Sequence, residues 1–200
     1  PRGYEQEPYL FRFPAGKNTL RIALNREGLA IRSIRLSAAD EIPAYAEVQR
    51  EYERLGYRPA SDYCQTVQGE LPLYKNSKSI LPKADRSSPT TTPGGGAGNS
   101  LNYIGADNWK SPGASITWEI EVKQDGLYKI LIKSRQKYSR DVNATRQLLI
   151  DGQLPFQEAA ALAFPYSSDW QNYTVGGEED PFLFYLTAGR HTVTLSVSLG

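Results

Sequence analysis

Short stretches in which apolar and polar residues alternate dominate the second half of the chain. In one of them Ile116, Trp118, Ile120 and Val122 alternate with Ser, Thr and Glu, which is the period of a half-buried β-strand. Similar stretches recur along the chain, with glycine-containing turns between them. The pattern therefore predicts strands over residues 101–104, 114–122, 127–134, 146–150, 171–175, 182–186 and 190–198.

Many short strands separated by turns predict an all-β fold, an antiparallel sandwich or jelly roll. Residues 155–164 fit a helical turn as well as a strand, and both assignments stay open. Residues 63–73 look extended. Residues 75–100 are rich in Ser, Thr, Pro, Gly and Asn, a composition that predicts a long surface loop.

One segment changes to the period of a helix. Between residues 42 and 55 the apolar positions recur at helical spacing, and the ends carry helix signals. The sequence thus predicts one amphipathic helix, packed on a sandwich or between two modules. Its polar face mixes acidic and basic side chains, which argues against a membrane-surface role. The apolar positions are Ile42, Tyr45, Val48, Tyr52 and Leu55, and the end signals are Asp40, Pro43 and Gly56.

The beginning of the chain repeats its end. Residues 7–22 align with residues 180–195 at a constant offset of about 173 residues. The aligned segments share Pro, Leu, Phe, Ala, Gly and Thr, and most other pairs are similar. A spacing this long fits a whole domain rather than a solenoid repeat. Residues 9–36, which read as three strands, are therefore predicted to close an upstream module.

The repeat predicts three parts along the chain. Residues 1–37 are expected to be the C-terminal strands of an upstream related module, residues 38–59 a linker helix, and residues 60–200 a β-sandwich module. The chain contains no Met and begins Pro1-Arg2-Gly3, so we expect a fragment of a larger protein. A tandem of small β modules is more often a binding device than an enzyme.

Composition narrows the function classes. The 200 residues have 40% hydrophobic content, a mean hydropathy of −0.51 and a formal net charge of +1. The hydrophobic content and hydropathy predict a soluble chain with a core, and the small net charge argues against nucleic acid as a partner. No apolar run approaches the length of a membrane span, which argues against direct membrane insertion. Cys64 is the single cysteine, so no intradomain disulfide is expected. We predict Cys64 to be a small, half-buried residue of a strand.

Groups suited to catalysis are few. His191, the single histidine, stands where the repeat has Asn18, and a catalytic base is not normally exchanged for Asn in a related module. Glu119 and Glu121 lie on the polar face of a predicted strand, whereas glycoside hydrolysis needs two carboxylates across a cleft. We therefore expect no catalytic residues and no enzymatic activity.

Three predicted loops combine an aromatic ring with hydrogen-bonding groups, at residues 107–109, 138–143 and 166–172. Sugars present apolar C–H faces and hydroxyl edges, and such loops suit both. Aromatic anchors of a sandwich edge would look the same, so both interpretations stay open. Trp118 alternates with core positions and is predicted to be core. The candidate ligand-binding residues are Asn108, Trp109, Tyr138, Arg140, Asn143, Arg146, Tyr166 and Trp170.

Basic side chains gather over one predicted hairpin. If several of them line the ligand loops, an anionic glycan that carries a uronic acid is the natural partner, because Arg pairs with carboxylates. The alternative is an ordinary basic edge strand that discourages aggregation. The cations are Lys129, Lys133, Arg135, Lys137, Arg140 and Arg146, and they face only Asp141.

The run 98–200 resembles the galactose-binding-like β-sandwich of carbohydrate-binding modules of families six and thirty-five. Residues 135–140 and 164–170 also resemble the N-terminal region of Gram-positive extracellular solute-binding lipoproteins, which attach such modules to a sugar-type ABC-transporter receptor. The matching segments of the module are 103–105, Trp109, 111–118, 124–130, 149–152, 164–170 and 186–195.

The resemblance implies a non-catalytic carbohydrate-binding module of a secreted or surface bacterial protein. It would capture a polysaccharide or oligosaccharide for an attached uptake receptor or enzyme, with the remaining domains of the parent protein as partners. Many relatives hold a structural calcium ion through an early Glu-rich strand. Only Glu70 is a candidate for that role here, so Ca²⁺ at Glu70 is the one cofactor expected. The alternative is a structural interdomain sandwich that binds no sugar.

Overall fold

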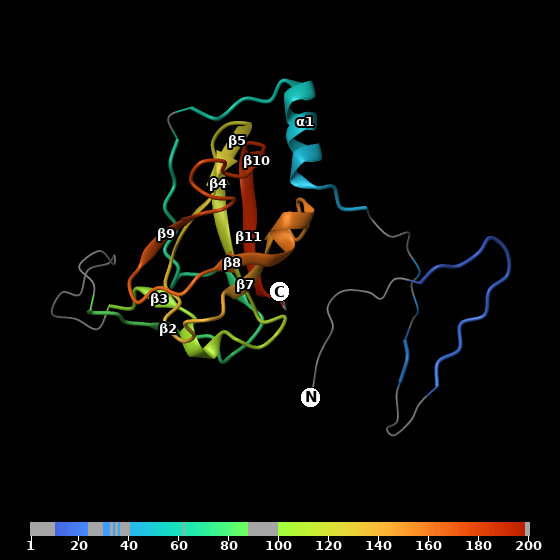
Figure 1. The fold of residues 1–200 in the computed structure, drawn as a ribbon, viewed down its shortest axis with the longest axis horizontal. Coiled ribbons are helices and arrows are strands. Elements are labelled where there is room, and N and C mark those ends of the chain that lie inside the picture. Colours follow the sequence, from blue (N-terminus) through green and yellow to red (C-terminus); the bar gives the residue numbers. More distant parts are fainter. Residues whose placement is uncertain are drawn as a thin grey trace. The chain divides into compact units, whose positions relative to one another are not determined.

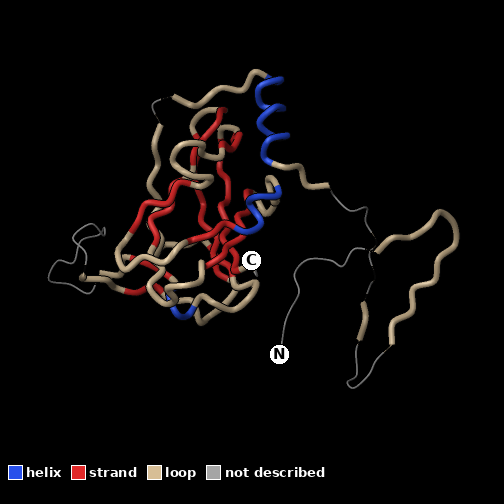
Figure 2. The backbone as a smooth tube through the Cα atoms, in the orientation of Figure 1, coloured by secondary structure: helices blue, strands red, loops and turns tan. Residues whose placement is uncertain are grey.

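Two units make up the chain in a computed structural model: residues 5–41, and residues 1–4 together with 42–200. The second unit, here the sandwich unit, holds every helix and strand among the described residues (Figure 1, Figure 2). The elements are α1 (Tyr45–Leu55), β1 (Tyr74–Lys75), β2 (Pro82–Lys83), β3 (Tyr103–Ile104), the 3-10 helix η1 (Ala106–Asn108), β4 (Ser115–Val122), β5 (Gly126–Lys129), β6 (Leu131–Ser134), β7 (Ala144–Ile150), the 3-10 helix η2 (Gln157–Ala161), β8 (Leu162–Phe164), β9 (Gln171–Thr174), β10 (Leu183–Leu186) and β11 (Gly189–Val197). The structure describes residues 11–23, 30–32, 34, 36, 41–61, 63–87 and 100–198.

One layer of the sandwich unit is a five-stranded antiparallel sheet in the order β1-β4-β11-β7-β8. The long strand β11 lies at its centre and pairs with β4 on one side and β7 on the other. In this register Leu195 stands opposite both Ile116 and Leu148, so apolar side chains of three strands meet on the inner face.

The other layer is built from the β5–β10 and β6–β9 pairs. Strands β5 and β6 follow one another with only Ile130 between them, and the Ile130 carbonyl accepts the Val175 N–H at 3.0 Å. A parallel bridge between Pro59 and Leu127 extends this layer on the far side of β5. Two antiparallel layers are thus present, as a sandwich requires.

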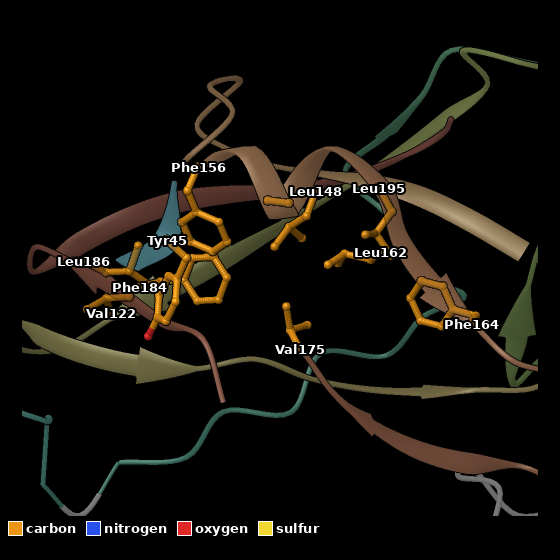
Figure 3. Close-up of a cluster of buried hydrophobic side chains, with 11 residues drawn as sticks. Tyr45, Val122, Leu148, Phe156, Leu162, Phe164, Val175, Phe184, Leu186 and Leu195 are labelled. Atoms are coloured by element: carbon orange, nitrogen blue, oxygen red, sulfur yellow. The ribbon is translucent and has the colours of Figure 1, made fainter. Parts of the chain in front are cut away.

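The core lies between the layers and is drawn in Figure 3. Its aromatic end holds Tyr45, Phe156 and Phe182, whose ring centroids lie 4.4–5.0 Å apart. Aliphatic side chains continue the core toward Phe164 (Figure 3), and these are Leu148, Leu162, Val175 and Leu195. The fold class expected from the sequence, an all-β antiparallel β-sandwich with one short helix, is confirmed.

Helix α1 packs on the sandwich, which is one of the two placements left open by the sequence. The buried Tyr45 accepts a hydrogen bond from the Leu183 N–H at 2.9 Å, and its own N–H donates to Glu158 at 2.8 Å. The helix ends at Gly56 as predicted, with φ of +71° there. The predicted start is wrong, because the helix begins at Tyr45 with Ala44 at the N-cap position. Asp40, the predicted N-cap, and Pro43, expected in the first turn, both precede the helix, and Asp40 lies outside the described residues. Among the described residues, no helix combines the length and the apolar character needed to cross a membrane.

Two sequence expectations before β4 are wrong. Residues 63–73 form no strand, and instead Tyr63 and Gln65 reach the backbone of Glu121 with their side chains. Because this segment joins no ladder, Cys64 is exposed rather than half-buried. The predicted loop over residues 75–100 contains the short strand β2, while residues 88–99 lie outside the described part.

The three strands predicted over residues 9–36 are absent from the described part of that range, which is 11–23, 30–32, 34 and 36. A strand or a lone hairpin is marginally stable unless a neighbouring strand or a packed face supports it. The assignment of residues 1–37 to an upstream module stays a prediction.

Candidate functional site

A hollow of about 350 Å³ opens where β6 and β8 end and β9 begins. Phe164 and Tyr173, with ring centroids 4.5 Å apart, supply its apolar wall. The other lining residues are mostly hydroxyl and amide side chains. We refer to this space as the β6–β9 hollow. It is lined by Ser134, Gln136, Phe164, Pro165, Tyr166, Ser167, Gln171, Asn172 and Tyr173.

Gln136 organises the loop above the β6–β9 hollow. Its side-chain amide donates to the carbonyls of Ser139 and Val142 at 2.8 and 2.7 Å. Its side-chain oxygen accepts the N–H groups of Tyr138 and Ser139 at 2.8 and 3.1 Å. The backbone carbonyl of Gln136 also accepts the Ser167 N–H at 2.8 Å, which joins the loop to the opposite wall. The loop geometry thus depends on one lining residue.

Tyr166 brings an aromatic face to the hollow. The Arg140 guanidinium carbon lies 5.6 Å from the centroid of this ring, within cation–π range. Arg140 is exposed and Tyr166 is half-buried. The wall therefore offers a ring face, a cation and hydrogen-bonding groups in one place.

Trp170, a candidate ligand residue, is instead an anchor of the protein. Its Nε1 donates to the Asp85 Oδ2 at 2.7 Å, and Arg135 stacks 4.8 Å above its ring. Arg135 also pairs with Asp85 at 2.8 Å, and the two side chains are 11% and 8% exposed. Burial alone would raise the pKa of Asp85, but the bonds from Ser87 and Trp170 and the charge of Arg135 hold that pKa well below its ordinary value.

Trp109 and Arg146 form a second anchor. The Trp109 Nε1 donates to the Ala114 carbonyl at 2.8 Å, and the Arg146 guanidinium stacks 4.3 Å above the ring. Arg146 also donates to the carbonyls of Trp109 and Thr145. Its Nε is buried without a hydrogen-bond partner. Burial lowers the pKa of Arg146 to about 10, so the side chain keeps its charge at neutral pH.

The remaining candidates are accessible but do not line the hollow. Tyr138 is 58% exposed, Asn143 is exposed and Asn108 is half-buried at the end of η1. Of the eight candidate residues, Tyr166 lines the hollow and Arg140 contacts its wall.

Several of the lining residues that sequence reasoning left out of the candidate set are polar positions at strand ends. Ser134 and Gln171 are register partners in the β6–β9 pair, as are Lys133 and Asn172. Knowledge of the strand pairing would have placed Ser134 and Gln171 together. The sequence pattern alone shows each strand but not its neighbour.

Glu70 is buried, and its Oε2 has no hydrogen-bond partner. An unpartnered carboxylate oxygen suits a cation. Within the described residues, however, no group of three or more His, Cys, Asp and Glu side chains gathers at one point. Backbone carbonyls and water would therefore have to supply the other calcium ligands. Structural calcium at Glu70 stays a prediction.

The His191 side chain connects the turn at Asp151 with the backbone at Thr187. Its Nδ1 lies 2.6 Å from the Asp151 Oδ2, and its Nε2 lies 2.9 Å from the Thr187 carbonyl. Hydrogen bonding to Asp151 raises the pKa of His191. Both ring nitrogens are thus occupied in holding the connections beside β11.

The chain is similar to several solved structures, at low sequence identity. No protein-family model matches the chain, and no curated protein matches it. A Paenibacillus sp. cycloisomaltooligosaccharide glucanotransferase matches over 78% of this chain and 21% of its own length, with 19% identity and a TM-score of 0.49. A family 35 carbohydrate-binding module from Clostridium thermocellum matches over 61% and 78% of the two chains, with 11% identity and a TM-score of 0.45. A family 35 module from Cellvibrio japonicus matches over 59% and 72%, with 18% identity and a TM-score of 0.41.

Proposed function

We propose that the sandwich unit is a non-catalytic carbohydrate-binding module and that the β6–β9 hollow is its binding surface. The observation that carries this proposal is the composition of the wall. Tyr166 offers an aromatic face, Arg140 lies over that ring, and hydroxyl and amide side chains surround it. A sugar needs such a combination, because its C–H face packs on a ring while its hydroxyls exchange hydrogen bonds.

The size of the hollow suits a short stretch or an end of a glycan. Small-molecule sites span about 300–1,000 Å³, and the hollow measures about 350 Å³. Its rim at Ser134, Gln171 and Asn172 lies at strand ends. Strand ends are held by the ladder, so little ordering of these side chains is needed on binding.

An acidic sugar is the glycan class that Arg140 favours. The basic side chains expected over one hairpin are instead spread over separate strands, because β6 pairs with β9 whereas β7 pairs with β11 and β8. Two of these cations interact within the protein: Arg135 pairs with Asp85, and Arg146 donates to backbone carbonyls. Arg140 remains at the wall, where its guanidinium can pair with a uronic acid carboxylate. Extracellular placement in a bacterial protein, with an attached sugar-uptake receptor or enzyme, completes the proposal and follows from the sequence resemblance.

Isothermal titration calorimetry against neutral and uronic-acid oligosaccharides tests the proposal. We expect Tyr166→Ala and Gln171→Ala to weaken binding by about tenfold or more, as expected for the loss of a central contact. Arg140→Gln should weaken binding of the acidic sugars selectively. Tyr74→Ala is the matched control, because Tyr74 is 61% exposed on β1, at the opposite edge of the five-stranded sheet from β8.

The proposal would be contradicted if none of the oligosaccharides gave a heat of binding while circular dichroism showed that the protein is folded. Such a result would favour the second candidate function, a structural module between domains. The specific observation behind that candidate is the use of Trp109 and Trp170 as internal anchors rather than as exposed platforms. Equal losses from Tyr166→Ala and Tyr74→Ala would place the sugar elsewhere on the module.

A further inference from the structure

Residues 11–23 carry the amino-acid pattern of a hairpin whose strands they do not form. At the offset of the repeat they correspond to residues 184–196. Residues 184–196 run through β10 and β11, whereas residues 11–23 contain no strand, as the absence of arrows in the blue segment of Figure 1 shows.

Both copies have a glycine with a positive φ between the two arms. Gly16 has a φ of +114°, and its counterpart Gly189 has a φ of +138°. Residues other than glycine rarely adopt this backbone region. The chain therefore bends at a glycine in both places, whereas only the second copy forms paired strands on either side.

The same apolar positions are buried in one copy and exposed in the other. In β10 and β11 they enter the sandwich core, and in residues 11–23 they are exposed to a large extent. The exposed fractions are 65% against 2% for Phe11 and Phe184, 41% against 4% for Phe13 and Leu186, and 51% against 5% for Ile22 and Leu195. Exposed alternating apolar residues on a preformed turn indicate an interaction surface.

We propose that residues 11–23 are the terminal hairpin of a second β-sandwich, and that their partner is a sandwich of this class without its own last two strands. The contacts of β10 and β11 define what the partner must offer. The first arm needs a strand like β5, and the second arm needs strands like β4 and β7 on its two sides. In that place the backbone of the second arm pairs on both edges and its apolar side chains fill a core.

A second copy of the sandwich unit does not offer this place unless it rearranges. Its own β11 already pairs with β4 and β7, and its β10 with β5. The partner is therefore a sandwich with a vacant hairpin position, and exchange of hairpins between copies is a separate outcome of the test.

The test is a tandem chain in which residues 42–180 are joined directly to residues 8–200. Pro8 then follows Asp180 in place of Pro181, so residues 8–23 stand where β10 and β11 stand in the upstream sandwich. We expect trypsin cleavage at Arg12, Lys17 and Arg21 to slow by about tenfold or more relative to the 200-residue chain, because buried, hydrogen-bonded strands are cleaved only after opening. The near-ultraviolet circular dichroism should also rise as a second core forms.

Two matched tandems serve as controls. In the first, residues 42–198 precede residues 1–200, so the upstream sandwich keeps its own hairpin and residues 8–23 stay readily cleaved. In the second, Phe11→Ser, Phe13→Ser and Ile22→Ser are introduced into the direct tandem, which should restore fast cleavage. Fast cleavage of the unmodified direct tandem, with the first control folded, would overturn the proposal. So would a concentration-dependent dimer of the 200-residue chain with residues 11–23 protected, since that shows exchange between copies.

Discussion

At the scale of single residues, burial and hydrogen bonding decide what each polar or aromatic side chain does. Trp170, Trp109 and Tyr166 are all loop aromatics with polar neighbours, yet two are anchors and one lines the hollow. The difference lies in the indole N–H, which needs a partner when buried. Asp85 supplies it for Trp170, and the Ala114 carbonyl supplies it for Trp109.

The ion pair of Asp85 with Arg135 predicts an acid-dependent stability. Asp85→Asn leaves Arg135 buried without its countercharge, so we expect the free energy of unfolding at neutral pH to fall by about 3–5 kcal/mol. The pKa of Asp85 is lowered in the folded state. The contribution of ionised Asp85 to the free energy of unfolding is therefore complete above the ordinary pKa of 3.8. It is lost as the pH falls through the lower pKa of Asp85 in the folded state.

Urea unfolding between about pH 2 and pH 7 measures this effect. The wild type should lose stability toward acid more steeply than the Asp85→Asn variant. Asp107→Asn is the control, because Asp107 is exposed and pairs with the half-buried Lys83 at the surface, and surface ion pairs contribute little. If Asp85→Asn lowers the free energy of unfolding as little as Asp107→Asn does, the buried pair does not stabilise the fold.

At the scale of elements, packing decides which predicted segments become regular structure. Helix α1 has 11 residues, a length that is marginal in isolation, but it is held by Tyr45 in the core. Residues 11–23 have the strand periodicity of β10 and β11, but they form no strand. Residues 127–134, predicted as one strand, divide into β5 and β6 around Ile130, whose carbonyl bonds to Val175.

Removal of the Tyr45 ring should detach α1 from the sandwich. Tyr45 lies 6% exposed between Phe156 and Phe182, and truncation of a buried aromatic residue destabilises by about 3–5 kcal/mol. We expect Tyr45→Ala to lose that amount in urea unfolding, with reduced helical ellipticity. Leu55→Ala, on the same helix at 44% exposure, should change stability by only about 0.5 kcal/mol. Similar losses in both variants would argue against docking through Tyr45.

At the scale of the whole sandwich unit, β11 joins the sheet together. It pairs with β4 over eight residue pairs and with β7 over five. Strands that are far apart in the sequence are thus hydrogen-bonded to the same central strand. The Glu70 carboxylate lies outside this ladder and keeps an unpartnered oxygen. Such a group lowers the stability of the unit unless a ligand satisfies it.

Calcium dependence of thermal unfolding tests whether that ligand is a metal ion. If calcium binds at Glu70, calcium at about 100 times its Kd should stabilise the unit by about 2.7 kcal/mol, and Glu70→Gln should abolish the effect. The exposed Glu178→Gln is the control. If the melting temperature is the same with calcium and with a chelator, calcium does not bind at Glu70.

Sequence alone determined the features that depend on neighbours along the chain. Alternation located β4 and β11 to within a residue or two, helical spacing located α1, and glycine located its end. Periodicity is set by backbone geometry, so it can be read without a partner. The sequence also directed attention to Tyr166 and Arg140, because ring and guanidinium chemistry is a property of the residue type.

Only the tertiary structure decided which side chains meet. Asp85 reaches Arg135 and Trp170 across 50 and 85 positions of sequence, and Ser134 meets Gln171 through strand register. Burial, ion pairing and cavity shape depend on contacts between distant segments, and one sequence holds no record of which segments pair. For the same reason, strand periodicity at residues 11–23 did not produce a strand, because a strand also needs a neighbouring strand or a packed face to support it.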